Sequence, residues 1–206
     1  MKSLFNLALL ISILAAVLVT FVSASAIEAS MPIALIILTV LSRKDDNCLL
    51  LTACFATVFL LSAIVMYVLK VVIFPAVESN YIQNIYAFMS SLSLSIFLLY
   101  LIKHRMTVGV LVTKGKSPTV FERNHAEGPL YFLVITMVTV DFMALTENFI
   151  RNLEHLGVTE ETAKVFWEVT FFYDYFEYLK AVPMLLCVLM LYVGLIVRTK
   201  NHQLQS

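Results

Sequence analysis

Residues 48–69 read CLLLTACFATVFLLSAIVMYVL, and this stretch decides the fold class. None of its side chains is charged. A helix that crosses a hydrocarbon layer about 30 Å thick needs roughly 20 apolar residues. The stretch therefore predicts a transmembrane helix. Its unbroken apolar run excludes a membrane β-strand, which alternates apolar and polar residues over about 10 positions.

The rest of the chain has the same character. Of its 206 residues, 61% are hydrophobic and 14% are charged, and the mean hydropathy is +0.91. A soluble domain is roughly 45–50% apolar and about 25% charged, so the composition excludes a water-soluble globule. The formal net charge of zero and the three cysteines also exclude a nucleic-acid-binding protein and a disulfide scaffold.

Six stretches are apolar and long enough, or nearly so, to cross a bilayer. We expect an all-α fold, a single polytopic transmembrane bundle (1–206) with no separate soluble domain. A basic loop, 103–128, and an acidic and aromatic segment, 149–180, connect the later spans. The six predicted spans are 4–22, 26–41, 48–69, 81–102, 129–148 and 181–197.

The first span has two interpretations. Lys2, the apolar run and the small residues at 24–26 also fit a cleavable signal peptide. The run of 19 apolar residues is longer than the usual 7–15, which favours a retained span. Small residues recur at every fourth position of the run, and such a face lets two helices pack closely. These residues are Ala8, Ser12, Ala16 and Thr20.

The basic residues predict the orientation. With a cytoplasmic N-terminus, ten of the 14 Lys and Arg residues lie on the inner side, as the positive-inside rule requires. The four cations assigned to the outer side are Lys70, Arg151, Lys164 and Lys180. We therefore expect both termini in the cytoplasm. The chain has no N-x-[ST] acceptor for glycosylation, so we expect a bacterial cytoplasmic (inner) membrane.

The loop 103–128 is predicted to be cytoplasmic and basic. The β-branched stretch 107–113 and the turn-like sequence 114–116 allow a small β-hairpin. The loop can rest on anionic headgroups, at roughly 1 kcal/mol per cation, or it can dock a partner protein.

The exported segment is predicted to be helical. Pro129 suits the first residue of a long helix, and Gly157 suits the position just after its end. Thr159 can then cap a new helix whose first turn holds two glutamates. We therefore expect an amphipathic outer helix over 159–178, before the last span.

Eight aromatic side chains fall within residues 166–178. They can form an interfacial aromatic belt, where such rings commonly lie. Combined with acidic residues, they also suit contact with a partner protein or a cationic ligand. The candidate contact residues are Trp167, Glu168, Phe171, Asp174, Tyr175, Glu177 and Tyr178.

Asp141 is the one acid well inside a predicted span. A carboxylate near the membrane centre costs about 2.5–3.5 kcal/mol on insertion scales, so such a residue normally has a partner or a function. Helical spacing indicates a polar path for protons or cations that leads from the outer side to Asp141. The other path candidates are Glu147, Asn148, Asn152, Glu154 and His155.

Asp141 can instead be a structural carboxyl group, protonated or bonded to another helix. Ser91 and Ser95 lie on one face of span 81–102 and are candidate partners. Serine is also common where membrane helices pack together.

Sequence motifs for catalysis are missing. The chain contains no HExxH, CxxC, GxSxG or glycine-rich nucleotide motif, so we expect no metal, no cofactor and no catalytic residue. Only five glycines occur, which makes the broken helices of an alternating-access transporter less expected.

Three functions remain open. We favour a non-enzymatic membrane subunit or interaction protein that contacts the lipid bilayer and another membrane protein or a second copy of itself. The alternative is a small transporter or channel for protons or cations that uses Asp141. A membrane-embedded enzyme is the third.

Overall fold

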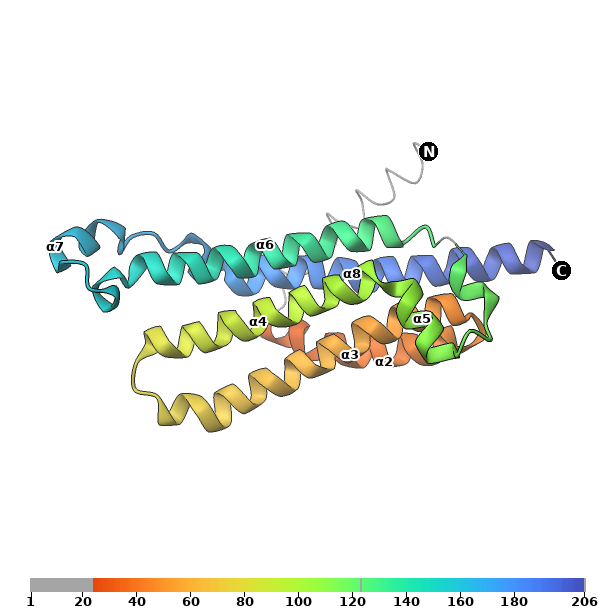
Figure 1. The fold of residues 1–206 in the computed structure, drawn as a ribbon, viewed down its shortest axis with the longest axis horizontal. Coiled ribbons are helices and arrows are strands. Elements are labelled where there is room, and N and C mark those ends of the chain that lie inside the picture. The colour runs from red at the N-terminus through yellow and green to blue at the C-terminus, as the bar shows by residue number, and fades with distance from the viewer. Residues whose placement is uncertain (1–23, 123, 206) are drawn as a thin grey trace.

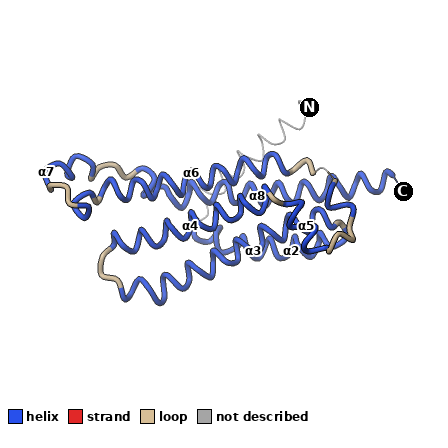
Figure 2. Tube along the Cα trace, in the orientation of Figure 1, coloured by secondary structure: helices blue, strands red, loops and turns tan. Residues whose placement is uncertain are grey.

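The computed structural model describes residues 24–122 and 124–205, and every element within them is helical (Figure 2). The predicted all-α class is confirmed for these residues. The predicted first span, 4–22, lies outside the described residues, and so do Ala8, Ser12, Ala16 and Thr20. The five long helices are α2 (Ala24–Leu41), α3 (Asp46–Val68), α4 (Asn80–Lys103), α6 (Glu127–Arg151) and α8 (Phe171–Gln205).

These five helices form a closed ring. Each helix packs on the next, in the order α2, α3, α4, α6 and α8, and α8 packs back on α2. Successive helices alternate in direction, so α2 and α8 run parallel where the ring closes (Figure 1). Buried apolar side chains from all five helices fill the ring, among them Leu35, Phe55, Leu98, Leu130 and Cys187.

The bundle has two ends with different content (Figure 1). We call one the α5 end, because it carries α5 (Arg105–Thr113) together with the turn between α2 and α3 and the C-terminus. We call the other the α7 end, because it carries α7 (Glu160–Ala163) and the connection between α3 and α4.

Among the described residues, four helical stretches are long and apolar enough to cross a membrane. They contain the whole of the predicted spans 48–69, 81–102, 129–148 and 181–197, whereas the predicted span 26–41, which lies in α2, is not among them. Many large apolar side chains on the outside of the ring are exposed, as expected where lipid replaces water. The four stretches are Asp46–Ala76, Asn80–Lys103, Glu127–Arg151 and Glu160–Thr199.

The third predicted span is longer than the sequence indicated. After α3 the chain continues through a π-helical turn, Leu69–Ile73, and a 3₁₀ turn, Phe74–Ala76, that contains Pro75. The side-chain amide of Gln83 donates hydrogen bonds to the carbonyls of Phe74 and Val77, at 3.1 and 2.6 Å. Gln83 thus satisfies backbone acceptors that the end of the helix leaves free.

The β-hairpin allowed for residues 107–116 is wrong. Residues 107–113 belong to helix α5, which buries Arg105 and Gly109 one turn apart on the same face. This tertiary packing overrides the strand preference of the β-branched residues. The turn itself is present, because Lys114 and Gly115 both adopt positive φ angles of 52° and 71°.

The single outer helix predicted over 159–178 is also wrong. The long helix α6 begins at Glu127 and ends at Arg151, earlier than predicted, and Gly157 with φ +88° instead ends a separate 3₁₀ turn, Leu153–Leu156. Thr159 precedes α7, as predicted, but α7 lasts one turn and a 3₁₀ turn, Lys164–Phe166, follows it. The chain then breaks, and α8 begins at Phe171 and runs through Pro183.

Glu147 of α6 explains why α8 begins where it does. Its carboxylate oxygens accept hydrogen bonds from the backbone N–H groups of Phe172 and Tyr173, at 2.8 and 2.7 Å. A carboxylate is stabilising at the positive end of a helix dipole and satisfies N–H groups that lack a helical partner. This contact joins α6 to α8 across 25 residues of chain, so no local sequence signal marks it.

Candidate functional site

A buried ion pair lies in the middle of the ring. Asp141 of α6 and Lys180 of α8 approach to 2.9 Å between Oδ1 and Nζ, and both side chains are buried. Asp141 is ten residues from Arg151 at the end of α6, about 15 Å along the helix axis. The charges are therefore far from either end of the bundle.

Two serines of α4 complete the surroundings of the carboxylate. Ser91 Oγ donates to Asp141 Oδ1 at 2.8 Å, and Ser95 Oγ donates to Oδ2 at 2.5 Å. The Lys180 ammonium also contacts Ser91 Oγ. The candidate partners Ser91 and Ser95 thus lie at Asp141, and both carboxylate oxygens have partners from a neighbouring helix.

Lys180 is the residue that the sequence reasoning missed. We assigned it to the outer side, and the structure places it inside the bundle, on the tenth position of α8. A signal was available, because Lys180 stands between the apolar residues Leu179 and Ala181. Asp141 lies ten residues before the end of α6, and Lys180 lies nine after the start of α8, so the two reach the same level.

A small cavity lies next to the ion pair. It measures about 10 Å³, which is close to the smallest volume that holds one water molecule. Ser62 of α3, Ser91, Ser95 and Lys180 are its polar lining, and the other lining side chains are apolar. The centre therefore has room for about one water and none for an organic substrate.

The predicted path residues beyond Asp141 lie toward the α7 end, where the two asparagines and His155 contact α4 or each other. Asn84 of α4 donates to the side-chain oxygen of Asn148 at 3.4 Å, and Asn148 donates to the carbonyl of Tyr81 at 3.4 Å. Asn152 donates to the carbonyl of Asn148 at 2.8 Å. The ring of His155 stacks on Tyr81 at 4.8 Å. These contacts hold α4 against α6 and against the 3₁₀ turn that follows α6.

The two glutamates of the predicted path have different surroundings. Glu147 is buried, and its carboxylate caps the start of α8, as described above. Glu154 is exposed in the 3₁₀ turn Leu153–Leu156. The structure therefore does not bring Glu154 to Asp141.

The predicted contact surface lies at the α7 end and is exposed. It spans the break before α8 and the first two turns of that helix, rather than one continuous outer helix. Lys164 pairs with Glu160 at 2.9 Å and lies 5.7 Å from the Trp167 ring centroid. The exposed side chains are Trp167, Glu168, Phe171, Asp174, Tyr175, Glu177 and Tyr178.

A second polar cluster at the α5 end was not predicted. Asn47 is fully buried, and its amide donates to the carbonyls of Thr119 and Glu122 at 3.1 and 2.7 Å. Its side-chain oxygen accepts from Arg105 Nη1 at 2.8 Å and from Asn124 at 3.1 Å. Asn47 therefore fixes Thr119, Glu122 and Asn124 to the start of α3.

Ion pairs surround this cluster. Arg105 contacts Glu127, and Arg198 of α8 contacts Asp45 and also Glu122, the latter at 2.7 Å. Burial would raise the pKa of Asp45, but the Arg198 guanidinium and the N–H groups of residues 47 and 48 outweigh it and hold that pKa below its ordinary value. The pairs tie the C-terminal part of α8 to the turn between α2 and α3.

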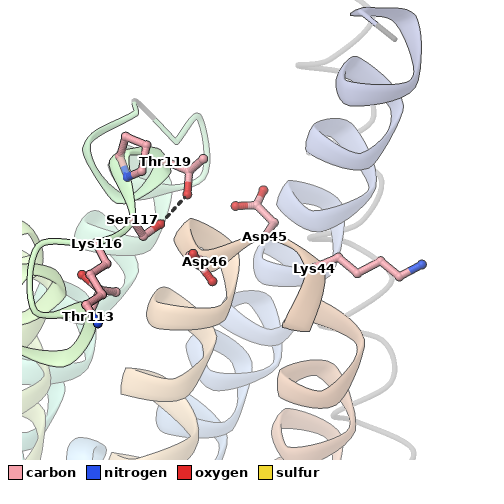
Figure 3. Close-up of a pocket in the computed structure, with 8 residues that line it drawn as sticks. Lys44, Asp45, Asp46, Thr113, Lys116, Ser117 and Thr119 are labelled. Atoms are coloured by element: carbon pink, nitrogen blue, oxygen red, sulfur yellow. Dashed lines mark hydrogen bonds between the residues drawn. The ribbon is translucent and has the colours of Figure 1, made fainter.

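An open pocket of about 410 Å³ lies beside this cluster. Figure 3 shows the Lys44 side chain pointing away from the other lining residues, and Ser117 bonded to Thr119 at 2.9 Å. Two lysines and two aspartates line the pocket, so its charge favours neither anionic nor cationic ligands. The lining residues are Lys44, Asp45, Asp46, Thr113, Lys116, Ser117, Pro118 and Thr119.

Within the described part of the chain, no three His, Cys, Asp or Glu residues lie close enough together to hold a metal ion. The cysteines Cys48, Cys54 and Cys187 are buried and unbridged. In comparisons with known proteins, no protein-family model, curated protein or solved structure matches this chain.

Proposed function

We propose that this chain is a multi-pass protein of a bacterial cytoplasmic membrane, with six spans and with the α5 end in the cytoplasm. Four helices long and apolar enough to cross support this topology. The charge distribution supports it further, because Lys180 no longer counts as an outer cation. Three outer cations then stand against ten inner ones, which sharpens the positive-inside asymmetry.

Within that membrane, the protein acts as a non-enzymatic subunit or interaction protein. One observation carries this proposal, namely that the polar side chains deep in the described bundle bond to one another. Asp141 is matched by Lys180 and two serines, and Asn148 is matched by Asn84. Charges that are paired in this way hold helices together and leave no buried group ready to receive a substrate.

The contact surface is the exposed aromatic and acidic face at the α7 end. Exposed aromatic side chains are the residue types that most often anchor protein interfaces. Trp167, Phe171 and Tyr175 are 42%, 56% and 54% exposed. The occupant is another membrane protein or a second copy of this chain.

The test compares two triple variants of the full chain, purified in mild detergent after crosslinking in native membranes. Trp167→Ala, Phe171→Ala and Tyr175→Ala should release a stoichiometric companion chain or reduce a homo-oligomer to monomers. The control changes three aromatics that are equally exposed elsewhere, Tyr67, Tyr100 and Phe132. A wild-type monomer without a companion, or equal effects of both triples, would refute the proposal.

A second function, proton or cation transport through Asp141, is favoured by one observation. The ion pair borders a cavity of about one water, and buried Asp and Lys residues in membranes often belong to proton pathways. In proteoliposomes, Asp141→Asn should then abolish flux that Glu154→Gln preserves. Wild-type vesicles as tight as empty ones would exclude this function.

A further inference from the structure

Helix α5 packs one face against the bundle very closely. Arg105 and Gly109 are buried, and a Cβ atom added at Gly109 would lie 2.2 Å from Val120 Cγ1 and 3.0 Å from Leu50 Cδ2. Leu50 is the fifth residue of α3, so α5 is held beside the first turns of that helix. The position of α5 is therefore fixed at the end of a predicted span.

The exposed surface of α5 is mostly apolar. Leu111 and Val112 are 74% and 68% exposed, and Met106 and Val110 are 53% and 40% exposed. Phe121, in the turn that packs on α5, is 49% exposed. Exposed apolar surface of this kind is unfavourable in water. In a membrane protein the neighbouring acyl chains can bury it.

Lysines border this apolar face. Lys103, Lys114 and Lys116 are exposed around α5. Two acids of the same segment have cationic partners within the protein, because Glu127 contacts Arg105, and Glu122 contacts Arg198, which also contacts Asp45. An apolar helix face bordered by lysines is typical of helices that lie in the headgroup region and attract anionic lipids.

We propose that α5 is an interfacial helix that inserts Leu111 and Val112 among the acyl chains of one leaflet and binds anionic phospholipid headgroups through Lys114 and Lys116. The left-handed turn at Lys114 and Gly115 ends the helix and places the two lysines just beyond its apolar face. Helix α5 begins two residues after the end of α4, which is long and apolar enough to cross a membrane, and this position favours lipid over a protein partner.

A tryptophan reporter tests this directly, because the chain has a single tryptophan, Trp167, at the other end of the bundle. Leu111→Trp is introduced together with Trp167→Phe in the full chain, and Val112→Trp serves as a second reporter if the first does not fold. The protein is reconstituted in vesicles of phosphatidylcholine and phosphatidylglycerol, with bromine on the acyl chains of one lipid at a time.

Brominated phosphatidylglycerol should quench the reporter more strongly than brominated phosphatidylcholine at the same mole fraction, with a preference of roughly fivefold per lysine. Lys114→Gln with Lys116→Gln should remove the preference. The control, Lys70→Gln with Lys164→Gln, changes the same charge at other positions and should keep it. No quenching by either lipid would overturn the proposal, and so would equal quenching by both.

Discussion

The Asp141 centre and the α5-end cluster both combine charges with small polar side chains, but they differ in redundancy. At the centre, one carboxylate meets one ammonium and two serines, and all four groups are buried. At the α5 end, two arginines share three carboxylates, and the Glu122 side chain is 51% exposed. When Asp45 or Glu122 is removed at the α5 end, Arg198 therefore keeps the other carboxylate as a partner. When Lys180 is removed at the centre, Asp141 keeps only the two serine hydroxyl groups and no cation.

The largest effect is expected for Lys180→Met, which leaves the Asp141 carboxylate buried without its cation. Breaking a buried pair in this way costs about 3–5 kcal/mol of unfolding free energy. Titration with a denaturing detergent measures it. Lys164→Met is the control, because its pair with Glu160 is exposed and should contribute no more than about 1 kcal/mol. Equal losses for the two variants would remove the distinction between the centre and an exposed pair.

Asn47→Ala should cost less, about 1–3 kcal/mol, because it leaves buried polar groups unsatisfied but strands no charge. Arg105 keeps its contacts with Glu127 and with the carbonyls of Val120 and Glu122. The same unfolding titration measures the effect. A loss larger than that of Lys180→Met would show that the α5 end, rather than the centre, is the less redundant cluster.

Glu147→Gln should weaken the start of α8 by about 1–2 kcal/mol, because a neutral amide is a poorer helix cap and offers one acceptor oxygen instead of two. The fluorescence of Trp167, four residues before α8, should report a loosened segment. Glu154→Gln, on an exposed neighbour, should leave both the fluorescence and the stability unchanged. If Glu154→Gln changes the fluorescence and the stability as much as Glu147→Gln does, the Glu147 cap has no special role.

The smallest effect concerns pH at the α5 end. The folded pKa of Asp45 lies below its ordinary value of 3.8, so its contribution to stability is present above that value and is lost as the pH falls through the lower folded pKa. Asp45→Asn should therefore flatten the acid limb of the stability curve by about 1 kcal/mol, since Arg198 keeps Glu122 as a second partner. An unchanged acid limb would contradict the assignment.

The helices were predictable where the apolar runs are continuous, because length and absence of charge decide a span. Helical spacing also predicted that Ser91 and Ser95 meet Asp141. Lys180 was missed because the predicted last span begins one residue after it, although its apolar neighbours Leu179 and Ala181 were a signal. The role of Asn47 has no local signal, since its amide bonds carbonyls 72 and 75 residues away.

The sharpest test of the central claim, that Asp141 and Lys180 hold the bundle together as one unit, is the double variant Asp141→Asn with Lys180→Met. The account predicts that adding Asp141→Asn to Lys180→Met restores most of the lost unfolding free energy, because the stranded charge is gone. If the double variant instead loses the sum of the unfolding free energies that the two single variants lose, the account is contradicted and the two residues act independently.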